Sequence, residues 1–412
     1  MREKADRQKE KQEKYVDVMV FGVLLLVVSA ITFTLFYRQT LGSPETGYHS
    51  DMKAYILEMQ GLDSGYSFPY PVFFKFSALL HLFVGPEMAV ALATMLLNSM
   101  AIVVLKCYFN RLMAEPMTQA VGGRKWLADS LISLLAISLF FISMLYPPSR
   151  IELPGILHKY LGVFTANPFH NATYMAARPF AILSFFQFAR LLDQYEEGAP
   201  AKDYIWFSLF LLLVTMTKPS FTIVLVGAAG LIMVYRMIRS KFKNFLPTIL
   251  LGLCFIPTFL DLLYQYKGVF VPEEGAEGGI GFGFGTVWAH YCHNIPLAIC
   301  LAVGFPLLVL VLHIKELKSD TLFRFSWQIY LMSFAMAFLL YEKGFRMVDF
   351  NFSWGYMYGI FFAFVGALPV LVRDTAQKKK PLLLALQWLA FLAHVICGLY
   401  YFYHIFLGQS YY

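Results

Sequence analysis

The stretch YVDVMVFGVLLLVVSAITFTLFY, residues 15–37, is an almost unbroken apolar run. A helix of about 20 such residues crosses the hydrocarbon core of a bilayer, which is about 30 Å thick. The head before it, MREKADRQKEKQEK, is polar and mostly cationic, and no small-residue cleavage site follows the run. We therefore predict an uncleaved first transmembrane helix, with residues 1–14 as a basic cytoplasmic head.

The composition extends this prediction to the whole chain. Of the 412 residues, 58% are hydrophobic and only 14% are charged. Because lipid offers no partner to unpaired backbone groups, segments that cross the bilayer must be helical. The predicted fold class is all-α, a polytopic membrane protein. The five cysteines form no CxxC pair, so they indicate neither a zinc site nor a disulfide framework.

The apolar runs and the basic residues together predict a topology. Twelve runs lie near residues 15–37, 70–84, 87–109, 127–146, 173–191, 204–217, 220–238, 245–264, 296–314, 326–341, 353–372 and 382–407. The run at 70–84 is short and contains Lys75 and His81, so we predict that it lies on the outer membrane surface. About 11 transmembrane helices remain. Cytoplasmic segments then hold 23 of the 33 Lys and Arg residues, as the positive-inside rule requires, and the net charge of +7 indicates no nucleic-acid partner.

This topology divides the chain behind the head into two modules. Residues 15–264 form a transmembrane module whose first outer loop spans residues 38–86. Residues 265–412 form a C-terminal transmembrane module, with outer loops at 265–295 and 342–352. The long loops are outside and the short basic loops are inside, so we expect any chemistry at the outer face.

The first outer loop contains YHSDMKAYILEMQG, residues 48–61, with charge beside a membrane span. Ser50 or Asp51 can cap a short amphipathic helix there. The apolar face of this helix is expected to carry Met52, Tyr55, Ile56 and Met59. Two interpretations of Asp51 stay open. It is only a helix cap, or it is a carboxylate at the lip of a cavity, where it can serve as a general base.

Three basic residues stand at unusual positions on the same side of the membrane. Arg178 lies in the first turns of a predicted span, where a cation is costly unless it faces a polar cavity or snorkels to the headgroups. Lys218 interrupts two apolar runs in TMTKPSF, and Arg346 lies between two spans. An anion site accounts for all three. Snorkelling and ion pairing with nearby acids are the alternatives.

Aromatic and glycine-rich segments complete the outer face. Asn351, Trp354 and Tyr356 can stack on or hydrogen-bond a sugar ring, or they belong to an interfacial aromatic belt. The segment EEGAEGGIGFGFG, residues 273–285, is either a mobile loop or a lid over a substrate cavity. A carboxylate, several cations and many aromatics on one membrane face suit an anionic lipid-linked substrate.

In this layout the chain resembles the GT-C superfamily of integral membrane glycosyltransferases, which use polyprenyl-phosphate-linked sugars. After the first span comes HSDMKAYILEMQG, with Asp51 as the acid of the first outer loop. SFPYPVFFKFSALLHLFVGPE is similar to a juxtamembrane entry helix. ALATMLLNSMAIVVLKCYFNRL and LADSLISLLAISLFFISMLYP resemble the second and third spans. The resemblance covers about the first 240 residues, and the rest only by general architecture.

The resemblance implies an inverting transfer of a hexosyl or pentosyl group at the outer face. Asp51 would accept the proton of an acceptor hydroxyl on a glycan, lipid or protein. The departing lipid phosphate would be held by Arg178, Lys218 and Arg346. The sugar or acceptor would contact His49, His170, Asn351, Trp354 and Tyr356. Relatives often carry paired acids in the first loop, so a divalent cation, Mg²⁺ or Mn²⁺, stays open as a cofactor. The expected location is a bacterial plasma membrane.

Two other functions fit the same sequence. A polysaccharide polymerase or ligase acting on undecaprenyl-linked glycans would share the cationic outer face but would not need Asp51 as a base. A lipid or sugar transporter would show paired repeats and broken helices at the membrane midplane. The sequence shows no clear internal repeat, and its unusual charged residues gather at one face.

Overall fold

A computed structural model describes residues 2–42, 47–145, 164–269, 279–292, 294–344, 347–348, 350–378 and 380–409. The α-helices are α1 (Arg2–Leu41), α2 (Met52–Gln60), α3 (Pro71–His81), α4 (Pro86–Ala120), α5 (Lys125–Ser138), α6 (Ala172–Gln194), α7 (Ala201–Thr217), α8 (Ser220–Arg239), α9 (Phe245–Leu253), α10 (Ile256–Val269), α11 (Ile295–Ala302), α12 (Gly304–Leu312), α13 (Thr321–Leu339), α14 (Ser353–Gln377) and α15 (Pro381–Phe406). The 3₁₀ helices are η1 (Trp288–His290) and η2 (Ile314–Lys318), and the strands are β1 (Ile280–Phe282) and β2 (Leu340–Glu342).

The predicted all-α class is confirmed, and the apolar helices make this an integral multi-pass membrane protein. Six helices are long and apolar enough to cross a bilayer: α1 from Tyr15 onward, α4, α8, α13, α14 and α15. Two bent pairs, α9–α10 at 47° and α11–α12 at 75°, raise the number to as many as 8. Of the other predicted spans, α5 has 14 residues and α7 has 17, and the 23 residues of α6 include Arg178.

The short apolar run at 70–84 forms the 11-residue helix α3. At 1.5 Å per residue such a helix is only about 16 Å long, roughly half the thickness of the hydrocarbon core. Pro71 occupies the first helical turn, where its missing N–H costs nothing, so the sequence also fixes where α3 begins. The length of α3 agrees with the prediction of a surface helix.

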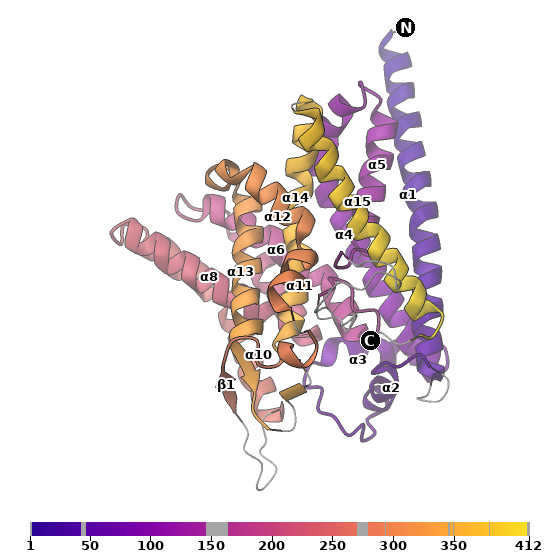
Figure 1. Cartoon of the computed structure of the whole chain (residues 1–412), viewed down its shortest axis with the longest axis vertical. Coiled ribbons are helices and arrows are strands. Elements are labelled where there is room, and N and C mark those ends of the chain that lie inside the picture. Colours follow the sequence, from indigo (N-terminus) through magenta and orange to yellow (C-terminus); the bar gives the residue numbers. More distant parts are fainter. Residues whose placement is uncertain are drawn as a thin grey trace.

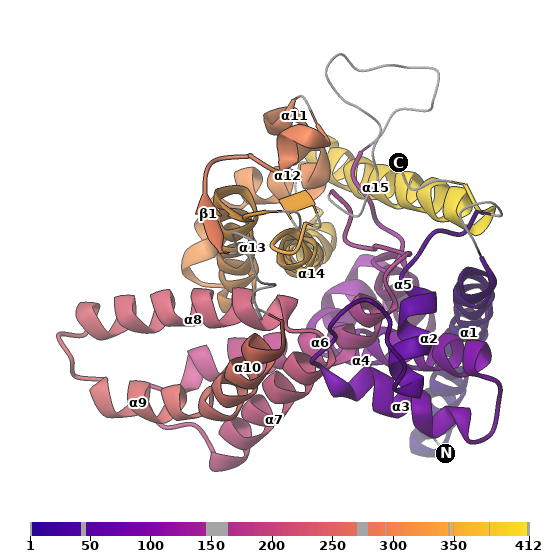
Figure 2. The same cartoon turned by 90° about the horizontal axis from the view of Figure 1, so that it is seen from below.

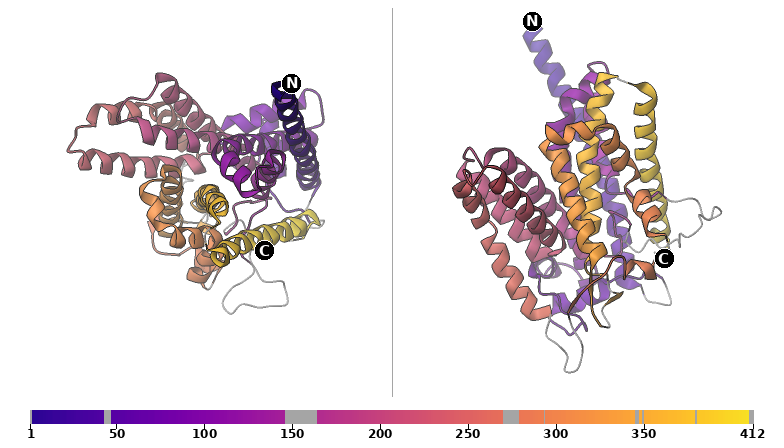
Figure 3. Two further views of the ribbon diagram at one scale, coloured as in Figure 1. Left: turned by 90° about the horizontal axis from the view of Figure 1, so that it is seen from above. Right: turned by 60° about the vertical axis from the view of Figure 1, so that its left-hand side comes forward.

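The ends of the bundle differ in character (Figure 1). The N-terminus projects from one end, whereas α2, α3, β1 and the C-terminus lie at the opposite end, which we call the distal end. Helices α7 to α10 stand out to one side of the bundle in Figures 2 and 3. The predicted separation of the basic head from the Asp51 loop is therefore present in the fold.

Helix α14 forms the centre of the bundle (Figure 2). It packs against α4, α8, α12, α13 and α15, and every residue of its most apolar 18-residue window is buried. Small residues allow the backbones to approach closely: a Cβ on Gly359 would collide with Ser333, and one on Gly366 with Ser326. Such glycine contacts are typical of helix packing in membranes, where apolar side chains gain little by leaving lipid.

A buried ion pair joins α1, α4 and α5 at the end of the bundle opposite the distal end. Lys106, only 3% exposed, donates to Asp17 Oδ1 at 3.0 Å, to Asn110 Oδ1 at 2.7 Å and to the Asp129 carbonyl at 3.1 Å. All three ammonium protons thus have a partner, which a buried charge requires to offset its loss of hydration.

The glycine-rich segment at 273–285 is only partly described, because residues 270–278 lie outside the described ranges. Its second half forms β1, which pairs antiparallel with β2, with Gly281 opposite Tyr341. A Cβ on Gly281 would collide with the Tyr341 ring, so this position needs glycine. The prediction of a loop is wrong for residues 280–282, which are in a strand, and the alternative of a lid stays a prediction.

Candidate functional site

Helix α2 forms where the sequence predicts it, and it presents the predicted face. Met52, Tyr55 and Met59 are buried, with exposed fractions of 0%, 1% and 9%. The Asp51 side chain, however, makes no capping hydrogen bond to the helix, and Ser50 Oγ instead accepts from the Met52 N–H at 3.3 Å. The carboxylate of Asp51 is therefore directed to other partners.

Those partners come from α2 itself and from the start of α6. Asn171 Nδ2 donates to Asp51 Oδ2 at 2.8 Å, and the Tyr55 hydroxyl donates to the same oxygen at 3.1 Å. Asn171 is held in place as the N-cap of α6, where its Oδ1 accepts from the Tyr174 N–H at 2.9 Å. Asp51 is exposed, whereas Asn171 and Tyr55 are buried. Two buried residues thus orient the carboxylate, which remains accessible to solvent.

Thr173 connects this carboxylate to Lys218. Its Oγ1 lies 3.2 Å from the Tyr55 hydroxyl, donates to Asn171 Oδ1 at 3.0 Å, and accepts from Lys218 Nζ at 3.2 Å. We call the five residues Asp51, Tyr55, Asn171, Thr173 and Lys218 the Asp51–Lys218 network. It joins residues that are far apart in the sequence at the ends of α2, α6 and α7.

Lys218 lies in the extended link between α7 and α8 and is 7% exposed. Its Nζ is 4.7 Å from the centre of the Trp354 ring and 5.8 Å from that of Tyr70, so aromatic faces supply part of the stabilisation that water would give. Burial lowers the pKa of Lys218 to about 8, although the negative charge of Asp51 acts in the opposite direction. The amine is mostly charged at pH 7, and it titrates close to physiological pH.

His170 is next to the network and is also 7% exposed. Its ring lies 5.8 Å from the ring of Trp354. Burial lowers the pKa of His170 to about 4, the charge of Asp51 raises it and the charge of Lys218 lowers it further. His170 is therefore neutral at pH 7, so it can take part in hydrogen bonding but adds no positive charge to the site.

Arg178, which the sequence places in a possible phosphate site, faces the protein core. It is 1% exposed and its guanidinium lies over the rings of Phe140, Tyr174 and Phe361, at 5.1, 5.3 and 5.6 Å. Nη2 donates to the Ala166 carbonyl at 3.2 Å. Arg178 neither snorkels to the surface nor hydrogen-bonds any residue of the Asp51–Lys218 network.

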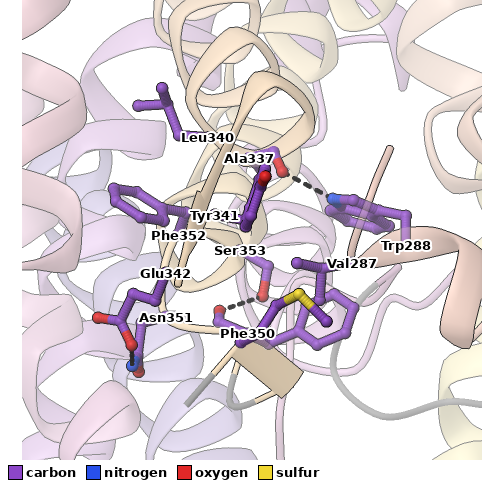
Figure 4. Close-up of a pocket in the computed structure, with 11 residues that line it drawn as sticks. Val287, Trp288, Ala337, Leu340, Tyr341, Glu342, Phe350, Asn351, Phe352 and Ser353 are labelled. Carbon is purple, nitrogen blue, oxygen red and sulfur yellow. Dashed lines mark hydrogen bonds between the residues drawn. The ribbon is translucent and has the colours of Figure 1, made fainter. Parts of the chain in front are cut away.

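Tyr356, Asn351 and Glu342 lie around the start of α14, apart from the network. Tyr356 is 0% exposed, and its hydroxyl is 3.1 Å from that of Tyr330. Asn351 Nδ2 donates to Glu342 Oε2 at 2.8 Å, and both side chains line a pocket (Figure 4). The pocket is a small, partly open hollow, whose empty volume of about 240 Å³ includes open solvent.

Four of the eleven residues that line the pocket are aromatic, and they come from η1, β2 and the link before α14. Trp288 forms one wall, where its indole N–H donates to the Ala337 carbonyl at 2.7 Å (Figure 4). Tyr341, Phe350 and Phe352 form other parts of the wall. An acid–amide pair beside aromatic rings can bind hydroxyl groups and the apolar face of a sugar ring, although the small volume admits only part of a glycan.

The structure thus brings together four of the residues that the sequence singles out: Asp51, Lys218, His170 and Trp354. His49 is exposed, two positions before Asp51, and Arg346 lies outside the described residues. The sequence alone does not single out Tyr55, Tyr70, Asn171 or Thr173 as members of the site. Asn171 and Thr173 belong to HNAT, a glycosylation sequon, yet Asn171 is only 2% exposed and caps a helix. An Asn directly before an apolar run, with Asn171 as the cap and Thr173 in the first turn of α6, was the available sequence signal.

The network does not fit a divalent cation. Mg²⁺ and Mn²⁺ favour several oxygen ligands, usually including more than one carboxylate. Asp51 is the network's single acid, its Oδ2 already accepts two hydrogen bonds, and the cation Lys218 is close by. Among the described residues, no group of three or more His, Cys, Asp or Glu side chains is close enough to hold a metal ion. We derive no chemical step through a metal.

Comparison of the chain with protein-family models, curated proteins and solved structures finds no match.

Proposed function

We propose that the protein is a membrane glycosyltransferase that moves a sugar from a polyprenyl-phosphate donor to an acceptor at the outer face, with inversion. The observation that carries the proposal is the Asp51–Lys218 network, which places an accessible carboxylate beside a buried lysine at the distal end. Transfer from a lipid phosphate needs a base for the acceptor and a cation for the leaving group, and the network contains both.

In this mechanism Asp51 is the general base. The acceptor hydroxyl gives its proton to the carboxylate while its oxygen attacks the anomeric carbon, and the bond from that carbon to the phosphate oxygen breaks. The two hydrogen bonds to Oδ2, from Asn171 and Tyr55, fix the orientation of the carboxylate. Such positioned proton transfer typically contributes about 10²- to 10⁴-fold to the rate.

Lys218 is the cation for the leaving phosphate. Negative charge grows on the phosphate as the glycosyl bond breaks, so a nearby ammonium stabilises the transition state more than the ground state. The rings of Trp354 and Tyr70 both lie near the amine, at 4.7 and 5.8 Å from Nζ. The half-buried Trp354 also lies only three residues beyond Asn351, so the start of α14 joins the network to the Glu342–Asn351 pocket, which we propose contacts the acceptor.

The membrane arrangement supports the same proposal. If α5, α6 and α7 cross the bilayer together with the six long helices and the two bent pairs, the number of spans reaches eleven, as in the predicted topology. With the basic head in the cytoplasm, the distal end then faces outward. The resemblance to GT-C enzymes, which rests on the Asp51 loop and the juxtamembrane helix α3, enters here as part of the proposal.

The test is a transfer assay with purified protein, a panel of polyprenyl-phosphate sugars and a set of glycan, lipid and peptide acceptors. We expect transfer from at least one donor, and a loss of about 100-fold or more in Asp51→Asn, because the amide cannot accept the proton. Asp63→Asn is the matched control, since Asp63 is an exposed acid on the same loop outside the network. Full activity of Asp51→Asn would reject the base and favour a polymerase or ligase.

Transport is the second candidate, and the bends of 47° in α9–α10 and 75° in α11–α12 favour it, because transporters place broken helices at their binding sites. A flux assay in proteoliposomes with fluorescent polyprenyl-phosphate lipids separates the two functions. Movement of lipid between leaflets without any sugar transfer would support transport and contradict the transferase.

A further inference from the structure

Asp51 and Lys218 carry opposite charges in one network, yet they do not pair. No nitrogen–oxygen contact within 4.0 Å joins these two described side chains. One path between them runs through two neutral hydroxyls, from Asp51 Oδ2 to Tyr55 at 3.1 Å, to Thr173 at 3.2 Å and to Lys218 at 3.2 Å. A second path reaches Thr173 through the neutral Asn171 amide, at 2.8 and 3.0 Å. By contrast, Lys106 and Asp17 in the same protein meet directly at 3.0 Å.

The two hydroxyls are well placed to keep the charges apart. Tyr55 is 1% exposed and Thr173 is 0% exposed, so packing fixes both. The Tyr55 ring lies against the rings of Phe68, Phe73 and Phe74, at centroid distances of 5.2, 5.9 and 5.8 Å. Burial, followed by the charge of Asp51, raises the pKa of Tyr55 well above its usual value, so the hydroxyl stays neutral.

Direct contact between Asp51 and Lys218 would weaken the carboxylate as a base and the ammonium as a phosphate-binding group. An adjacent cation stabilises the carboxylate and makes it a weaker base. The same contact would occupy the ammonium, which then has less attraction left for a phosphate. A spacer of neutral hydroxyls avoids both effects while it still holds the two groups in one orientation.

We propose that Tyr55 and Thr173 are positioning residues that separate the Asp51 carboxylate from the Lys218 ammonium, so that each charge remains available to substrate. The benefit of keeping the two charges apart rests on the proposed function, but the separation itself can be tested without any substrate. Removing either hydroxyl lets the flexible lysine side chain move toward Asp51 and form the direct ion pair.

The test measures the pH at which Lys218 becomes reactive toward formaldehyde and a borane reductant, with the methylated peptide quantified by mass spectrometry. We expect the midpoint to rise by about one pH unit in Tyr55→Phe and in Thr173→Val, because a new ion pair favours the charged amine. The other titratable groups that face this pair are His170, Tyr55 and Tyr70. An unchanged or lowered midpoint in both variants would overturn the proposal.

Three further variants make the result specific. Thr173→Ser keeps the hydroxyl and should keep the wild-type midpoint; a rise there would mean that packing rather than the hydroxyl matters, and would contradict the spacer. The double variant Asp51→Asn/Tyr55→Phe should show no rise, because the ion pair needs the carboxylate. Tyr195→Phe and Thr215→Val are matched controls at buried sites outside the network, and neither should move the midpoint.

The transfer assay gives a second readout. In Tyr55→Phe and Thr173→Val, we expect kcat/KM to fall by about tenfold and its acidic limb to move to lower pH, because the paired carboxylate holds its proton less tightly. If Tyr55 served only as a hydrogen-bond donor, the limb would move to higher pH, which would contradict the spacer. Failure of the Asp51→Asn test leaves the lysine titration unaffected, so the two failures can be told apart.

Discussion

Two lysines in the described part of the chain are buried, and they differ in how their charge is satisfied. Lys106 donates hydrogen bonds from its ammonium to Asp17, to Asn110 and to the Asp129 backbone carbonyl. The Lys218 ammonium, at the distal end, makes one hydrogen bond within the described part of the chain, to Thr173, and otherwise lies against aromatic rings. The first lysine is saturated with protein partners and the second is not.

Under the proposed function, this difference separates a structural charge from one that binds substrate. A saturated ion pair has no bonding capacity left for a ligand, and its task is to join helices. An ammonium with one hydrogen bond and two aromatic neighbours can still bind an anion, and burial lowers its pKa to about 8 despite the opposing charge of Asp51. The two side chains are chemically identical, so under this proposal their different partners decide whether each lysine joins helices or binds an anion.

The largest difference between the two lysines is expected when each is replaced in turn and the free energy of unfolding is measured. Lys106→Met leaves the Asp17 carboxylate without its cation and with the Ser133 hydroxyl at 3.3 Å, and we expect a loss of about 3–5 kcal/mol in the free energy of unfolding. Lys218→Met should change that free energy by less than about 1 kcal/mol, because Asp51 is exposed and keeps its other hydrogen bonds. Denaturant titration in detergent measures both. Equal destabilisation by the two changes would mean that Lys218 is a structural charge as well.

A second test uses pH. Because burial lowers the pKa of Lys218 to about 8, the ammonium is present below that pH and is lost above it. We expect the affinity for a polyprenyl-phosphate donor to fall by up to about tenfold per pH unit above 8, as for loss of one essential charge. Lys218→Arg keeps its charge at these pH values and should remove the decline. Constant donor affinity in wild type between pH 7 and 9.5 would contradict a phosphate contact.

The smallest expected effect concerns the rings around the two lysines. Trp354→Phe weakens the cation–π contact with Lys218, and we expect donor KM to rise by about fivefold, equivalent to about 1 kcal/mol. Phe21→Leu is the matched control, since the Phe21 ring lies 5.9 Å from Lys106 Nζ. It should leave donor KM unchanged. Equal effects of the two substitutions would show that ring contacts do not distinguish the lysines.

Part of the site can be predicted from local sequence. The buried face of α2 follows from helical spacing, and the short α3 follows from run length and Pro71. Asp51 and Lys218 were recognisable because charge beside an apolar span is costly, so each required an explanation. For Arg178 the same argument indicated a polar cavity or the surface. The structure instead surrounds it with aromatic rings, a long-range packing arrangement that local spacing does not contain.

The sequence alone determined that the chain is a helical membrane protein with unusual charge beside its spans, because bilayer thickness and the hydrogen-bonding needs of the backbone act on every segment separately. Only the tertiary structure decided that Asp51 and Lys218 share one network, that Tyr55 and Thr173 lie between them, and that Tyr356 is closed off in the core. Those arrangements depend on how the ends of α2, α6, α7 and α14 meet, and helix packing fixes them through contacts between residues far apart in the chain.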